Sequence, residues 1–135
     1  MKPLTATSAF FLIAFATASI AQDKVSTVPV AFAKGSSSAS LKGNLGGYDS
    51  VNYTLGAKGG QTMTVKISGS SNANFNVFAP GDRPGSSTAL GSGSVGSNWS
   101  GKLPTSGTYT IQVYQMRASA RRGEQVPFNI AFQIH

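Results

Sequence analysis

Apolar and polar residues alternate along much of the chain in short segments. The clearest segment covers residues 108–113, where Tyr109, Ile111 and Val113 are separated by polar residues. A period of two residues is typical of a β-strand that buries one face and exposes the other. The segment therefore predicts a strand that leads directly into the basic residues that follow it.

The same alternation predicts strands elsewhere, and Gly- and Ser-rich turns separate them. They cover residues 28–32, 37–41, 51–55, 62–67, 74–77, 99–103 and 128–134, with a weaker one near 89–90. Pro29 favours an edge position for the first of them, because proline cannot donate a ladder hydrogen bond. No segment has the sustained 3.6-residue apolar period of a long helix.

This arrangement predicts an all-β fold, an antiparallel β-sandwich of seven or eight short strands, with a small closed barrel as the alternative. Residues 82–98, which are mostly Gly, Ser, Pro and Ala, are expected to form a long loop. The predicted core consists of Val65, Ile67, Phe75, Tyr109, Ile111, Val113, Ile130 and Phe132.

The first 21 residues have the pattern of a secretory signal peptide. Lys2 precedes an apolar run over residues 9–20, and small residues follow. A membrane span needs about 20 apolar residues, whereas this run has about a dozen. We expect cleavage after Ala21, with cleavage after Ala18 as the alternative. The mature chain would then be a single domain of residues 22–135, periplasmic or secreted and without stable membrane insertion.

Charge and composition narrow the classes of function. Without Lys2 the chain has ten Lys and Arg against four Asp and Glu, so its net charge is about +6, and it has no cysteine. A basic protein can bind nucleic acid, an anionic surface or an acidic site on a partner. The lysines are scattered singly, as is usual for solubility, and we predict no nucleic acid partner. Only the arginines cluster, at Arg117, Arg121 and Arg122.

The sequence offers little for catalysis, so we predict that the protein is not an enzyme and has no cofactor or metal. The one histidine is His135, and no two carboxylates form an evident acid–base pair. Asp49 lies in a Gly-rich turn, where an aspartate can contribute to a calcium site but more often caps the turn.

The arginine segment supports two interpretations. If residues 117–121 form one helical turn, Arg117 and Arg121 share a face at a cost of a few tenths of a kcal/mol from like-charge repulsion. The planar guanidinium group binds carboxylates through two parallel hydrogen bonds, which favours a binding site. The alternative is a solvated connection between strands, and residue types alone do not decide between them.

Several motifs along the predicted domain together resemble one family. They are residues 32–39 (FAKGSSSA), Gly47-Tyr48-Asp49, Tyr53-Thr54, 57–61 (AKGGQ), 78–81 (FAPG), 103–109 (LPTSGTY), and Arg117 with Ala120-Arg121. In these the mature chain resembles the periplasmic inhibitors of g-type (goose-type) lysozyme. Residues 82–98 depart from the family pattern, because they are richer in Gly and Ser than expected for that family.

The resemblance implies a β-sandwich that inserts an exposed surface into the substrate cleft of a g-type lysozyme and so protects peptidoglycan. In the family, a Tyr in the Gly-Tyr-Asp turn and two arginines four residues apart carry the inhibition. The matching residues are Tyr48, Arg117 and Arg121, which are therefore expected to converge at one pole of the sandwich.

Residues 104–111 also resemble the strand entry of pre-peptidase C-terminal domains, in which the tyrosine packs at a corner. Tyr109 is accordingly expected to be structural. This likeness leaves a carbohydrate- or envelope-binding module of that type as the alternative function. A structural envelope or adhesion protein is the third possibility.

Overall fold

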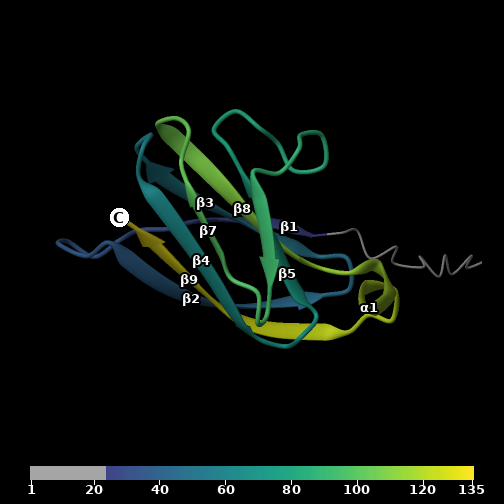
Figure 1. Cartoon of the computed structure of the whole chain (residues 1–135). Coiled ribbons are helices and arrows are strands. Elements are labelled where there is room, and N and C mark those ends of the chain that lie inside the picture. The colour runs from purple at the N-terminus through teal and green to yellow at the C-terminus, as the bar shows by residue number, and fades with distance from the viewer. Residues whose placement is uncertain (1–23) are drawn as a thin grey trace, which may run out of the picture.

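The computed structural model describes residues 24–135, and the predicted signal peptide lies outside this range. Two β-sheets face each other, and one short helix lies at one end (Figure 1). The elements are β1 (Val25–Pro29), β2 (Ser38–Gly46), β3 (Ser50–Ala57), β4 (Thr62–Gly69), β5 (Ala73–Phe78), β6 (Gly91–Ser94), β7 (Trp99–Lys102), β8 (Gly107–Gln115), α1 (Arg117–Arg121) and β9 (Gln125–Ile134).

The predicted all-β sandwich is confirmed. One sheet has the strand order β1-β3-β8-β5-β6 and the other β2-β9-β4-β7. Every neighbouring pair is antiparallel except β1 and β3, which run parallel, with Val25 opposite Ser50. Residues 24–135 thus form nine strands, one or two more than the alternation predicts.

Several strands are longer than predicted, and β2 extends five residues past its predicted end to Gly46. β6 and β1 differ most in position, because pairing, and not apolar alternation, defines them. β6 has the sequence Gly-Ser-Gly-Ser and lies in the expected loop, yet it pairs along β5. β1 begins three residues earlier than predicted, since its register with β3 includes the polar Ser26 and Thr27. Its edge position agrees with the prediction from Pro29.

The core lies between the two sheets, and all eight predicted core residues are buried there. Tyr53 of β3 extends across it to two rings of β9, with centroids 5.6 Å from Phe132 and 6.4 Å from Phe128. Such tilted and edge-on pairs stabilise a core beyond the area that they bury.

The predicted structural role of Tyr109 is confirmed. Its ring is fully buried, and its hydroxyl donates a 2.6 Å hydrogen bond to the Thr105 carbonyl. The Thr105 amide donates back to the same hydroxyl at 3.3 Å. These bonds hold the bend between β7 and β8, at the pole opposite α1.

Several strand ends meet at the pole that carries α1. β1 and β3 begin there, and β8 ends there, because β3 is parallel to β1 and antiparallel to β8. β2 ends at Gly46, opposite Gln125 at the start of β9. The turn at residues 47–49 therefore lies beside the segment that links β8 to β9 (Figure 1).

Candidate functional site

A surface hollow of about 520 Å³ lies where the turn at residues 47–49 meets α1. Tyr48 and Arg121 both line it, although they are far apart in the chain. The complete lining is Gly46, Gly47, Tyr48, Asp49, Ala120, Arg121, Gly123 and Gln125. Within residues 24–135, Tyr48 is one of four large hydrophobic side chains that are exposed, with 49% of its area accessible.

The turn that presents Tyr48 is held from both sides. Gly47 has a φ of 55°, a left-handed conformation that favours glycine. The Asp49 amide donates to the Gly46 carbonyl at 3.0 Å and closes the turn. The Asp49 carboxylate accepts a 2.9 Å hydrogen bond from the Lys24 amide, which fixes the start of β1. The Asp49 side chain thus has a structural role, although it holds the start of β1 and does not cap its own turn.

The backbone carbonyl of Glu124 connects the α1 segment to this turn. The Glu124 carbonyl accepts hydrogen bonds from Gln115 Nε2 at 2.8 Å and from the Gly47 amide at 3.3 Å. It therefore joins the end of β8, the start of β9 and the Tyr48 turn. Within the segment, Ser119 and Ala120 are buried and anchor α1 against the sandwich.

The structure divides the arginine cluster into two kinds of residue. Arg122 Nε lies 2.9 Å from Glu124 Oε1. The other oxygen of that carboxylate accepts a 2.8 Å hydrogen bond from Asn72 Nδ2. Arg117 and Arg121 are exposed and form no ion pair or side-chain hydrogen bond within residues 24–135. The two unpaired guanidinium groups are the ones that the resemblance selects.

The helical turn considered for residues 117–121 is present, since α1 runs from Arg117 to Arg121. Tyr48 and Arg121 share the hollow. Arg117 opens the same helix four residues earlier but does not line the hollow. All three residues thus lie at one pole of the sandwich.

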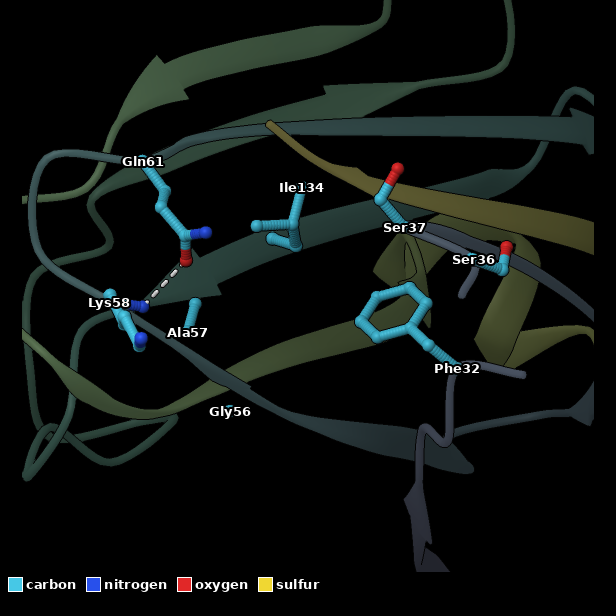
Figure 2. A pocket seen from close by; sticks show the side chains of 8 residues that line it. All are labelled: Phe32, Ser36, Ser37, Gly56, Ala57, Lys58, Gln61 and Ile134. Atoms are coloured by element: carbon cyan, nitrogen blue, oxygen red, sulfur yellow. Dashed lines mark hydrogen bonds between the residues drawn. The ribbon is translucent and has the colours of Figure 1, made fainter. Parts of the chain in front are cut away.

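Another hollow, of about 420 Å³, lies at the opposite pole, where β3 and β9 end (Figure 2). Phe32, Ala57 and Ile134 supply its apolar surface. Gln61 Oε1 accepts a 2.8 Å hydrogen bond from the Lys58 amide. The lining residues include no carboxylate or histidine, and Lys58 is the one ionisable side chain among them.

Residues 24–135 contain neither a candidate metal site nor a helix that could span a membrane. No group of three or more His, Cys, Asp or Glu in this part of the chain could hold a metal ion. No helix in it is long and apolar enough to cross a membrane. What the α1 pole offers is an exposed aromatic ring beside unpaired guanidinium groups, which suits recognition of a partner surface.

Comparison with known proteins identifies the family. The chain is 37% identical over 107 residues to the inhibitor of g-type lysozyme of Escherichia coli K12, covering 79% of this chain and 80% of the relative. Its structure matches the crystal structure of Aeromonas hydrophila PliG, a periplasmic inhibitor of g-type lysozyme. That match has a TM-score of 0.82 and 65% identity, and it covers 84% of this chain and 99% of the other. The chain belongs to the family of periplasmic g-type lysozyme inhibitors.

A more distant structural neighbour shows only the fold. The pre-peptidase C-terminal domain of a Bacillus anthracis collagenase superposes with a TM-score of 0.55 at 12% identity, covering 82% of this chain and 96% of that domain. No protein-family model matches the chain.

Proposed function

We propose that this protein is exported to the periplasm or beyond and inhibits a g-type lysozyme, by placing Tyr48, Arg117 and Arg121 in the substrate cleft. The observation that carries the proposal is the pairing of an exposed tyrosine with two unpaired arginines at one pole of a family member. Inhibition by occupation of the cleft would keep the enzyme from peptidoglycan and requires no chemistry from the inhibitor.

The charge of the arginines suits the cleft of a glycosidase. Such a cleft contains a general-acid carboxyl group and acceptors for sugar hydroxyls. A guanidinium group can donate two parallel hydrogen bonds to one carboxylate, and charge-assisted bonds of this kind are about twice as strong as neutral ones. Because Arg117 and Arg121 have no partner within residues 24–135, no internal ion pair would have to break first.

The geometry of α1 suits two separate contacts. Residues four apart in a helix lie on one face with a rise of about 6 Å, so the two arginines can reach different acceptors in one cleft. Tyr48 projects from a turn whose backbone is fixed by the Glu124 carbonyl. A side chain carried on a fixed backbone has less conformational entropy to lose on binding, and tyrosine is enriched among the residues that dominate interfaces.

The experiment is a turbidity assay of bacterial cell-wall lysis by g-type, c-type and i-type lysozymes, with and without the purified mature protein. We expect inhibition of the g-type enzyme and weaker inhibition after substitution of both Arg117 and Arg121 by Ala. Arg122→Ala is the matched control, since that arginine is occupied by Glu124. Unimpaired lysis by g-type lysozyme at saturating protein would contradict the proposal.

A further inference from the structure

The start of α1 lacks the features that normally stabilise a helix N-terminus. The N-cap residue is Met116. Its extended backbone angles (φ −64°, ψ 152°) are usual for this position, but its side chain makes no capping hydrogen bond. Ser, Thr, Asp and Asn are favoured at such a position, because their side-chain oxygen accepts a free backbone amide. The first turn also has no acidic residue and begins with the cation of Arg117. Cations at this end oppose the helix dipole.

Met116 is also unusually exposed for an apolar residue. Within residues 24–135 the large hydrophobic side chains with the greatest exposure are Val25 at 59%, Met116 at 58%, Tyr48 at 49% and Leu90 at 39%. Leu90 precedes β6 and lies at the opposite pole, since its amide bonds to Val77 near the far end of β5. The other three gather at the α1 pole.

The sheet register brings these three positions close together. Val25 starts β1 opposite Ser50, and Tyr48 lies two residues before Ser50. Met116 follows the end of β8, which pairs with β3 through Val113 and Val51. Three adjacent strand ends thus each present one exposed apolar side chain beside the two unpaired arginines. A single exposed hydrophobic residue is ordinary, but a gathered set marks an interaction surface.

We propose that Met116 is an apolar anchor of the lysozyme-binding surface, with Val25 extending that surface at its edge. The proposal rests on the proposed function and identifies an additional contact of the same site. The N-cap position gives up local helix stability so that a flexible, polarisable side chain can pack against the partner. Methionine is well suited to this because its unbranched chain adapts to irregular surfaces.

Met116 is both the N-cap of α1 and the proposed apolar contact, so Met116→Ser should raise stability and weaken inhibition. Serine should cap α1 and raise the thermal unfolding midpoint by roughly a few degrees. Loss of the apolar contact should at the same time weaken inhibition of g-type lysozyme about tenfold. Met116→Leu keeps an apolar side chain and should inhibit within about threefold of the wild type.

The experiment measures the inhibition constant in the lysis assay and the unfolding midpoint for each variant. Leu90→Ser is the matched control, since it removes an exposed apolar residue from the opposite pole and should leave inhibition unchanged. If the wild type inhibits and Met116→Ser inhibits equally well, the anchor is overturned while the proposed function stands. If Met116→Ser lowers the midpoint, the capping argument is wrong. A wild-type protein that fails to inhibit removes both proposals.

Discussion

The side chain of Gln115 donates a 2.8 Å hydrogen bond to the Glu124 carbonyl, and this bond closes the segment that carries both candidate arginines. Gln115 is buried at the end of β8, and Glu124 immediately precedes β9. The Gly47 amide donates to the same carbonyl. This one backbone oxygen therefore links the end of β8 to the Tyr48 turn, in addition to the buried Ser119 and Ala120 that anchor α1.

Replacement of this glutamine should loosen the site more than the sandwich. Gln115→Met has a similar volume but removes the donor, and a typical lost hydrogen bond costs about 0.5–1.5 kcal/mol. We expect a drop of about that size in the free energy of unfolding, measured by urea denaturation. Amide hydrogen exchange should become faster in residues 117–124 and stay unchanged in β4. Equal protection of residues 117–124 in both proteins would show that the bond does not hold this segment.

The three clustered arginines should separate into two functional classes. Arg117→Ala and Arg121→Ala should each weaken inhibition by tens-fold or more, because truncating one partner of a buried interfacial charge pair costs about 2–5 kcal/mol. Their unfolding midpoints should change little or rise slightly, since a like-charge pair is removed.

Arg122→Ala should show the reverse pattern. It breaks the pair with Glu124, which is largely exposed and so stabilises the fold by no more than about 1 kcal/mol. Inhibition should stay close to that of the wild type. Titration of lysozyme activity against each of the three variants makes the comparison. Equal loss of inhibition in all three would mean that general positive charge, and not the two unpaired arginines, drives binding.

Tyr48 is predicted to bind through its ring. Tyr48→Ala should weaken inhibition by about tenfold or more if the ring becomes buried against the partner. Tyr48→Phe keeps the ring and should retain most of the inhibition. The same lysis assay distinguishes these outcomes, with the unfolding midpoint as the check on folding. A Phe variant as weak as the Ala variant would assign the binding to the hydroxyl group instead.

The sequence predicts the parts of the fold that apolar alternation determines. Tyr109, Ile111 and Val113 are buried in β8 as expected, because a strand with one dry face needs this period. β6 was not predictable from its composition, since its Gly and Ser residues are held by pairing with β5. The parallel pairing of β1 with β3 depends in the same way on a contact between distant segments.

The candidate site is likewise predicted only in part from the sequence. The resemblance to the inhibitor family selects Tyr48, Arg117 and Arg121, and the sequence of residues 117–121 is compatible with the helical turn found in α1. The sequence does not reveal that Glu124 occupies Arg122 and leaves the other two free. It also does not reveal the bonds from Gln115 and Gly47 to one carbonyl, because these join residues that are distant in the chain.

Stability at alkaline pH should depend on Tyr53. This residue is 2% exposed, and burial raises the pKa of its phenol above the usual 10.0, because the core disfavours the charged tyrosinate. A raised pKa in the folded state means that, above about pH 10, the folded chain binds more protons than the unfolded chain. The contribution of the neutral Tyr53 phenol to the free energy of unfolding is thus fully present below about pH 10. It is lost as the pH rises through the folded-state pKa.

The corresponding variant is Tyr53→Phe, which keeps the ring beside Phe128 and Phe132 and removes the ionisable group. Urea unfolding midpoints measured from about pH 7 to about pH 11 should fall less steeply for the variant than for the wild type above about pH 10. Lysine deprotonation affects both proteins alike, so the difference between the two curves isolates the phenol. Parallel curves over the whole range would mean that Tyr53 ionises as easily in the folded protein as in the unfolded chain.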